Sequence, residues 1–391
     1  MNKKLVISGT GCALADNLYT NIDFNNSTFQ KFLSKSNADG GLSPGKLVFT
    51  EEFENFAGKR LYDVIDEITD GRAASGFNIG GPSIVSLIGA AQLLFHLDVK
   101  INFYGAVGND NIGNLILDGL ASTQVNVDQY KRYDTQSPFT DVFSDPNYDM
   151  GRGERIFINN IGAAWKYQPQ DLDDAFFSSD ITVFGGTALV PNIHDHLTEL
   201  LHKAKNNNCN TVVNTVYDFR NEKLHPSEKW PLVKNDDFEL IDLLIMDKEE
   251  ALKTSGQTTI NDAIDFFISN NSNALIITQG PDPVLFYSSG NYFSGESISE
   301  MPVSKDISAE LKKGNTKGDT TGCGDNFVGG VIASIAHQVI QGKKIPDIKE
   351  VVKWGIISGG LACFYYGGVF KENRNGQKYV MHQEYLSAYN E

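Results

Sequence analysis

The chain has 391 residues, of which 41% are hydrophobic and 21% charged, so it can bury a large core and is not a disordered protein. Its formal net charge of −16 argues against nucleic acid and anionic membranes as main partners. The four cysteines, Cys12, Cys209, Cys323 and Cys363, are widely spaced and form no CxxC pair. They predict neither a zinc site nor a disulfide framework, and they fit a reducing compartment such as the cytoplasm.

Short apolar runs alternate with helical patterns along most of the chain. The run over 4–8 is interpreted as a first strand rather than a signal peptide, because Ser8–Gly11 interrupts it. No apolar run reaches about 18 residues, so no membrane-spanning helix is expected. Further buried strands are predicted over 100–107, 180–186, 210–216, 242–247 and 274–280, and helices over 81–97, 192–208, 248–256 and 260–271.

This alternation predicts an α/β fold with a mostly parallel, doubly wound sheet flanked by helices. Ligands of such sheets bind beyond the carboxyl ends of the strands. Two regions break the alternation: residues 18–75 are polar and irregular, and residues 130–166 have a strand-like pattern. We predict that both belong to a small β lid over a single domain spanning 1–391. Surface insertions without function are the alternative.

Residues 318–330, GDTTGCGDNFVGG, precede an apolar stretch that predicts a helix over 327–340. Glycines leave backbone N–H groups accessible, and the N-terminal end of a helix attracts anions. The amides of Gly322–Gly324 are therefore candidates for a phosphate site. Asp325 at the helix entry is either an N-terminal cap or a base that accepts the proton of an attacking hydroxyl.

The stretch DTTGCGDNF resembles the DTxGAGDxF signature of the ribokinase-like sugar kinases, also called the PfkB family, with Cys323 in place of the usual alanine. The resemblance implies a ribokinase-like fold, with Asp325 as the catalytic base. It also implies that Gly322, Cys323 and Gly324 form an anion hole for the transferred phosphate. In several members the residues at the positions of Asp319 and Thr321 help to hold a monovalent cation, so K⁺ is a further implied ligand.

The resemblance extends upstream to a substrate site. In SGTGCALADNLY, Asp16 stands five residues after a glycine, where the family has an aspartate that binds substrate hydroxyls. A carboxylate suits this role because it can accept two hydroxyl hydrogen bonds. GFNIGGPSIV resembles the family's GGxxxN segment through Gly80 and Gly81, but Val85 occupies the asparagine position. Asn78 is the candidate that could supply the missing polar contact.

The resemblance extends downstream to a nucleotide site. IMDKEE resembles the family's NxxE motif, with Asp247 at the asparagine position and Glu250 three residues later on the same helix face. This pair could order Mg²⁺ through waters beside the ATP phosphates, or it could be an N-cap with its first-turn glutamate. ALIITQG resembles the strand and turn whose residues, here Thr278 and Gly280, lie along the nucleotide.

Two other motifs compete with this interpretation. Residues 40–46, GGLSPGK, match the spacing of a P-loop, but Leu47 lacks the hydroxyl that binds Mg²⁺, so a polar lid loop is predicted. His194, His196 and His202 share a helical pattern without an evident carboxylate partner. They are predicted to be surface or core histidines rather than metal ligands.

The expected function is ATP-dependent, Mg²⁺-requiring phosphorylation of a small hydroxyl compound, with a sugar as the first candidate. A nucleoside kinase of the adenosine-kinase branch, whose first turn CALAD resembles, is the alternative, as is a non-catalytic sugar-binding regulator on the same scaffold. Phe24, Phe29, Phe32 and Trp165 of the lid could wall a nucleoside base, although core packing also explains them. A homodimer, if one forms, is expected to join through the lid.

Overall fold

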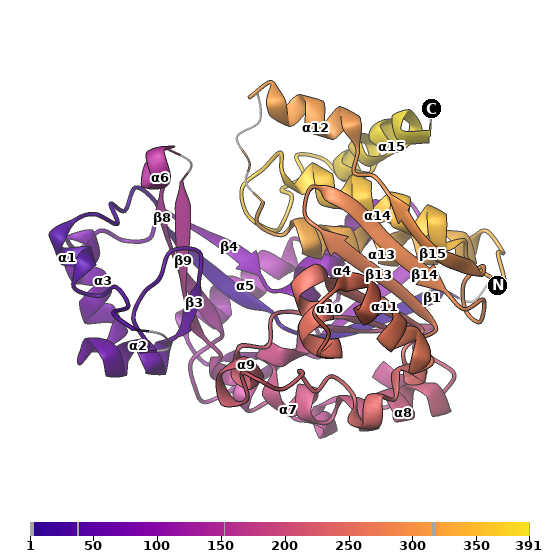
Figure 1. The fold of residues 1–391 in the computed structure, drawn as a ribbon, viewed down its shortest axis with the longest axis horizontal. Coiled ribbons are helices and arrows are strands. Elements are labelled where there is room, and N and C mark those ends of the chain that lie inside the picture. The colour runs from indigo at the N-terminus through magenta and orange to yellow at the C-terminus, as the bar shows by residue number, and fades with distance from the viewer. Residues whose placement is uncertain (1–3, 37–38, 152, 315–317, 319, 391) are drawn as a thin grey trace.

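An eight-stranded sheet forms the centre of the larger part of the molecule, in the order β15-β14-β13-β12-β11-β10-β1-β5 (Figure 1). The computed structural model describes residues 4–36, 39–151, 153–314, 318 and 320–390. The strands are β1 (Leu5–Gly11), β5 (Val99–Tyr104), β10 (Ile181–Gly185), β11 (Asn210–Asn214), β12 (Leu243–Asp247), β13 (Ala274–Gln279), β14 (Asp282–Ser288) and β15 (Glu296–Met301). In the sheet order, the neighbouring strands from β5 through β1, β10, β11 and β12 to β13 pair in parallel. Strands β14 and β15 form an antiparallel edge.

The central strands are buried on both faces, which explains why they are continuous apolar runs in the sequence. In β12, Leu243 and Ile245 belong to one hydrophobic core, and Leu244 and Met246 belong to a second core on the other face. The predicted α/β architecture and the six predicted strands of this sheet are confirmed, with bounds that differ by a few residues.

Helices cover both faces of this sheet. The layer that contains the first core consists of α4 (Pro82–Leu93), α13 (Cys323–Ile340) and α14 (Ile348–Ala362), with α5 (Asn111–Ala121), α12 (Lys305–Lys312) and α15 (Gln377–Asn390) around it. The opposite layer contains α7 (Pro191–Asp195), α8 (Leu197–Asn206), α9 (Phe219–Leu224), α10 (Lys248–Ser255) and α11 (Ile260–Ser269). The single helix predicted over 192–208 is thus two helices, because the backbone leaves the helical conformation at His196. In the part of the chain described, no helix is long and apolar enough to cross a membrane.

A second, five-stranded sheet projects to one side of the larger part, at the left of Figure 1, and we call it the lid sheet. Its order is β3 (Leu47–Phe49), β9 (Glu154–Asn160), β8 (Phe139–Asp145), β2 (Leu14–Tyr19) and β4 (Gly76–Gly80). The short helices α1 (Ser27–Gln30), α2 (Thr50–Ala57) and α3 (Leu61–Thr69) accompany it, α6 (Tyr148–Gly151) links β8 to β9, and β6 (Ala106–Gly108) pairs with β7 (Lys131–Tyr133) nearby.

The prediction that residues 18–75 are irregular is wrong. This region contains α1, α2, α3 and β3 between the lid strands β2 and β4. The buried residues Leu61, Val64 and Ile65 of α3 follow helical spacing, so the helix is stabilised by one apolar face. The strand predicted within 152–165 is confirmed as β9.

Candidate functional site

Asp16 lies where the chain passes from the large sheet to the lid sheet. Strand β1 ends at Gly11 and β2 begins at Leu14, so only two residues connect the sheets. A Cβ atom added at Gly80 would lie 2.2 Å from Oδ2 of Asp16, so a side chain at this position would displace the carboxylate. A Cβ atom added at Gly81, which has a φ of 103°, would lie 2.7 Å from the carbonyl oxygen of Cys12. The two glycines therefore make room for Asp16 and for the crossing chain.

Asn78 lies directly opposite Asp16 in the antiparallel pairing of β2 with β4. Its side-chain nitrogen contacts Gly367, where an added Cβ would be only 2.2 Å away. Val85 is 1% exposed and packs against Gly368, so it belongs to the core of α4 rather than to the wall of the site. The structure therefore brings Asn78 to Asp16 and explains Val85 by packing.

The anion loop, residues 320–325, forms the start of α13. Its N-cap is Gly322, which has a φ of 74° and lies so close to Gly368 that an added Cβ would be 2.5 Å from the Cα of that residue. No side chain of the described residues caps this helix. The N–H groups of Gly322, Cys323 and Gly324 thus belong to the first turn, which offers them no intrahelical acceptor. The N–H of Cys323 makes only a long bond, 3.3 Å, to the Thr320 carbonyl.

Asp325 lies in the first turn of α13 but does not cap it. Among the described residues its carboxylate accepts no hydrogen bond, so the capping interpretation is wrong for this residue. Burial raises the pKa of Asp325 to about 6. The result is an unengaged carboxylate at the entry of a helix.

Asn326, the next residue, ties the loop to the C-terminal part of the chain. It is 1% exposed, and its Nδ2 donates to the carbonyls of Gly322 (2.9 Å) and Gly368 (2.7 Å). Its Oδ1 accepts from the buried ammonium of Lys378 (2.5 Å) and from the hydroxyl of Tyr365 (3.2 Å). An ammonium can only donate, so Lys378 fixes which end of the Asn326 amide faces the loop.

Three acidic side chains converge on this region. Burial and, to a smaller extent, the negative charge of Asp325 raise the pKa of Asp16 to about 7, although Arg155 acts in the opposite direction. Burial, followed by the charge of Asp247, raises the pKa of Glu250 to about 7, and Asp325 contributes there as well. The negative charge of Asp325 therefore opposes the ionisation of both Asp16 and Glu250.

Asp247 and Glu250 form a reciprocal capping box at the start of α10. Asp247 Oδ1 accepts from the Glu250 N–H (2.8 Å), while Glu250 Oε2 accepts from the Asp247 N–H (2.9 Å) and the Thr215 hydroxyl (2.6 Å). The described residues contain no group of three or more His, Cys, Asp or Glu side chains that could hold a metal directly. One oxygen of each carboxylate stays outside this box, which fits Mg²⁺ held through its waters, the mode that Mg²⁺ prefers.

The residues expected along the nucleotide lie beside this capping box. Thr278 pairs with Asp247 in the parallel β12–β13 register, and Gly280 lies in the turn after β13 with open space where a side chain would be. Of the pair expected to hold a monovalent cation, Asp319 lies outside the described residues. Thr321 is described, and its hydroxyl accepts a hydrogen bond from Arg155.

Arg155 is a candidate functional residue that sequence reasoning missed. It lies on the lid strand β9, and its guanidinium crosses to Thr321 in the anion loop, 166 positions away in the sequence. The same group lowers the pKa of Asp16. Its position between the two carboxylate-bearing segments depends on folding of the lid, and no local motif marks it. Asn326 and Lys378 were missed for the same reason.

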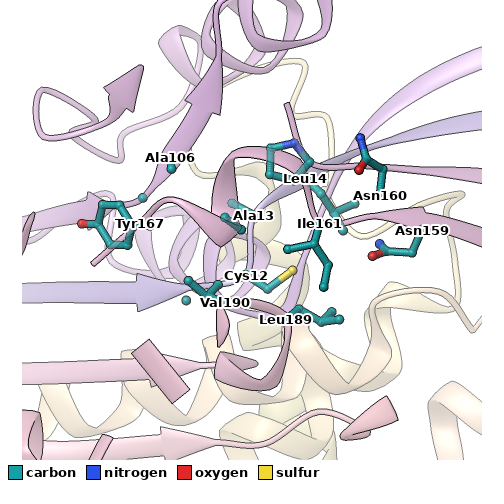
Figure 2. Close-up of a pocket in the computed structure, with 14 residues that line it drawn as sticks. Cys12, Ala13, Leu14, Ala106, Asn159, Asn160, Ile161, Tyr167, Leu189 and Val190 are labelled. Atoms are coloured by element: carbon teal, nitrogen blue, oxygen red, sulfur yellow. The ribbon is translucent and has the colours of Figure 1, made fainter. Parts of the chain in front are cut away.

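A small hollow, with a cavity volume of about 10 Å³, adjoins the crossing between the sheets. Figure 2 shows Cys12, Ala13 and Leu14 in its middle, with Tyr167 on one side and Asn159 on the other. Its wall is largely apolar. Asn159 is 2% exposed, and its Oδ1 has no hydrogen-bond partner among the described residues. The hydroxyl of Tyr167, which also lines the hollow, likewise has no partner among the described residues, so the hollow offers two buried polar atoms beside the segment that leads to Asp16.

Comparison with known proteins agrees with this geometry. An adenosine kinase from Schistosoma mansoni, solved with 2-fluoroadenosine, superposes with a TM-score of 0.69 at 16% identity, covering 94% of this chain and 97% of its own. A probable sugar kinase from Rhizobium etli gives 0.68 at 16%, covering 98% and 99%. The ribokinase of Thermotoga maritima gives 0.61 at 16%, also covering 98% and 99%. These likenesses show the ribokinase-like fold.

The sequence itself matches the model of the pfkB family carbohydrate kinases over residues 72–372. This span contains the anion loop, Asp325 and the Asp247–Glu250 capping box. The chain therefore belongs to the PfkB family of carbohydrate kinases.

Proposed function

We propose that this protein transfers the γ-phosphate of ATP to a hydroxyl group of a small sugar. The observation that carries the proposal is Asp325, a carboxylate without a capping role at the start of α13, with a pKa raised to about 6. A base works best when its pKa lies near the operating pH, so that it is ionised yet still basic. A structural carboxylate in this position would be expected to cap the helix.

The acceptor would be held by the lid. Asp16 can accept two hydroxyl hydrogen bonds once it is ionised, and Asn78 opposite it adds an amide. Arg155 favours the ionised form of Asp16. Gly80 and Gly81 would let a sugar approach the backbone, in addition to making room for the carboxylate. Asp325 would then take the proton from the hydroxyl that attacks.

The transferred phosphoryl group would bind at the anion loop. The amides of Gly322, Cys323 and Gly324 are oriented by the helix and need no reorganisation, which is the arrangement that stabilises charge in a transition state most effectively. Arg155, which already contacts Thr321, would add a guanidinium from the lid. Closure of the lid would thus complete the site and exclude water.

The nucleotide would lie along the carboxyl ends of β12 and β13, beside Thr278 and Gly280. Asp247 and Glu250 would hold Mg²⁺ through its waters, and the bound ion would neutralise charge on the phosphates. A requirement for K⁺ through Asp319 and Thr321 is part of the proposal and can be tested by exchanging K⁺ for tetramethylammonium in the assay.

A nucleoside is the second candidate acceptor, and the hollow beside Leu14 is the observation that favours it. Its apolar wall and the polar atoms of Asn159 and Tyr167 match a flat heterocycle with an amino group in chemistry, and the hollow would have to widen before such a ring could enter. Phe24, Phe29 and Phe32, in contrast, are at most 4% exposed and pack in the lid core, so they cannot wall a base. Trp165, the fourth of these aromatics, is 45% exposed, so Trp165 and the hollow remain as the arguments for a nucleoside.

The test is a screen of pentoses, hexoses and nucleosides for ATP-dependent phosphorylation, with Asp325→Asn and Asp16→Ala as variants. We expect turnover of a sugar, a kcat that falls about 10²–10⁴-fold in Asp325→Asn, and a kcat/KM that falls strongly in Asp16→Ala. Phosphorylation of a nucleoside far above every sugar would replace the first candidate with the second. Sugar binding without any turnover would instead favour a non-catalytic regulator.

A further inference from the structure

Two cysteines that are 40 positions apart meet at the anion loop. Cys323 is the first residue of α13, and Cys363 is the C-cap of α14. Their sulfur atoms are 3.2 Å apart, and both residues are partly exposed to solvent. A disulfide needs a separation of about 2.05 Å, so the two sulfurs have only about 1.2 Å to close.

The backbones of both cysteines are closely packed against neighbouring glycines. A Cβ added at Gly318 would lie 2.1 Å from the carbonyl oxygen of Cys363, and one added at Gly359 would lie 2.9 Å from that of Cys323. Neither backbone segment can therefore move far without a clash. A covalent link between the sulfurs would therefore act on the first turn of α13, where the amide of Cys323 belongs to the anion hole.

We propose that Cys323 and Cys363 form a reversible disulfide that switches off phosphoryl transfer. The effect on transfer rests on the proposed kinase function, whereas formation of the bond does not. With hydrogen peroxide as the oxidant, one thiolate attacks the peroxide and becomes a sulfenic acid, releasing one water. The second thiol then displaces the sulfenic oxygen as a second water. In total, two thiols and one peroxide give one disulfide and two waters.

The other two cysteines provide internal controls. Cys12 is 3% exposed and Cys209 is 1% exposed, and the thiol of Cys209 donates to the Phe177 carbonyl (3.1 Å). Burial raises the pKa of both thiols, so they react slowly with peroxide. The accessible pair at the anion loop should therefore be oxidised first.

The bond itself is tested by peptide mapping. The reduced full-length protein is treated with a small excess of hydrogen peroxide, its remaining thiols are alkylated, and it is digested without reductant. We expect one linked pair of peptides, containing Cys323 and Cys363, that dithiothreitol separates and that Cys363→Ala abolishes. A map in which these cysteines are alkylated or overoxidised but never linked would overturn the proposal.

The switch is tested on the same samples by activity. We expect oxidation to lower kcat about 10²-fold, the loss typical of removing one donor from an anion hole, and dithiothreitol to restore it. Cys363→Ala should keep its activity through the peroxide treatment. A complete disulfide with kcat within twofold of the reduced enzyme would overturn the switch. If the reduced protein phosphorylates no acceptor, the kinase proposal fails while the peptide map still decides whether the bond forms.

Discussion

Asp325 is expected to destabilise the folded protein, which is consistent with the catalytic role that we propose for it. Its carboxylate has no hydrogen-bond donor among the described residues, and burial disfavours its charge. Because its pKa is about 6 in the folded chain and about 3.9 in an unfolded one, ionisation destabilises the fold. This destabilisation is fully present above pH 6 and disappears as the pH falls towards 4.

Asp325→Asn should therefore stabilise the protein at high pH while it impairs catalysis. We expect the free energy of unfolding at pH 8 to rise by about 2 kcal/mol, allowing for partial solvent screening, and the gain to vanish near pH 4. Urea denaturation of both proteins at pH 4.5, 6 and 8 measures this difference. A gain that is equal at all three pH values would show that ionisation of Asp325 is not its cause.

Arg155 connects the lid to the anion loop, so its loss should affect both the phosphoryl group and Asp16. We expect Arg155→Gln to lower kcat about 10²-fold or more. It should also shift the acidic limb of the pH profile upward, because Arg155 lowers the pKa of Asp16. Arg132→Gln is the matched control, since this exposed arginine of β7 hydrogen-bonds only to Asn114 (3.0 Å) among the residues described. Equal effects of the two substitutions would contradict a specific role for Arg155.

At the scale of elements, the sequence predicts what depends on local pattern. The strands of the large sheet are continuous apolar runs, and the anion loop has its own motif, so both could be found. Helices α2 and α3 were missed, although the apolar residues Leu61, Val64 and Ile65 of α3 follow helical spacing in the sequence. The break between α7 and α8 at His196 was not predicted, because the sequence has no glycine or proline there.

Contacts between distant segments could not be predicted in this way. Cys323 and Cys363 were interpreted as unrelated because spacing says nothing about two helix ends that the fold brings together. His194, expected to lack a carboxylate partner, lies 3.3 Å from the buried Asp218, which comes from the following strand–helix connection. The Gly367–Gly368 turn likewise reaches the anion loop only after α14 reverses the chain.

Helix α15 influences the site through one buried contact, the bond from Lys378 to Asn326. Lys378→Met removes a buried ammonium whose pKa is lowered to about 7 by burial, so the fold should not lose stability. It also removes the donor that orients the Asn326 amide, so kcat should fall at least several-fold while the acceptor KM stays within twofold. Lys353→Met, which removes the exposed Lys353–Asn390 contact, is the control. An unchanged kcat with normal stability would assign Lys378 to packing alone.

At the scale of the whole molecule, contacts between the lid and the larger part should stabilise the closed position of the lid. Phe49 of β3 packs edge-on against Phe219 of α9, with ring centroids 6.1 Å apart. An ion pair joins Lys223 to Glu52 nearby, and Arg155 joins Thr321 on the opposite side. The ion pair is exposed and contributes little to the stability of the contact between the lid and the larger part. The aromatic pair should therefore provide most of the stabilisation where these two contacts lie.

Phe49→Ala should shift the lid towards the open form. Aromatic pairs contribute about 0.5–1.5 kcal/mol, which corresponds to a rise in acceptor KM of about 2- to 12-fold, with kcat nearly unchanged. Steady-state kinetics with the identified acceptor measure this. Phe56→Ala is the control, since Phe56 contacts Gly41 within the lid. If Phe56→Ala raises KM as much as Phe49→Ala, lid integrity rather than closure is responsible.

Asp16 belongs to the lid sheet, whereas Asp325 and the anion loop belong to the helix layer of the larger part. The groups proposed to select the acceptor, which end at Gly81, and those proposed to transfer the phosphate, which begin at Gly322, are therefore encoded in separate stretches of the gene, about 240 codons apart. Mutation or recombination in the first stretch can alter the acceptor while the second is inherited intact. A scaffold divided in this way can acquire new substrates through changes confined to its lid.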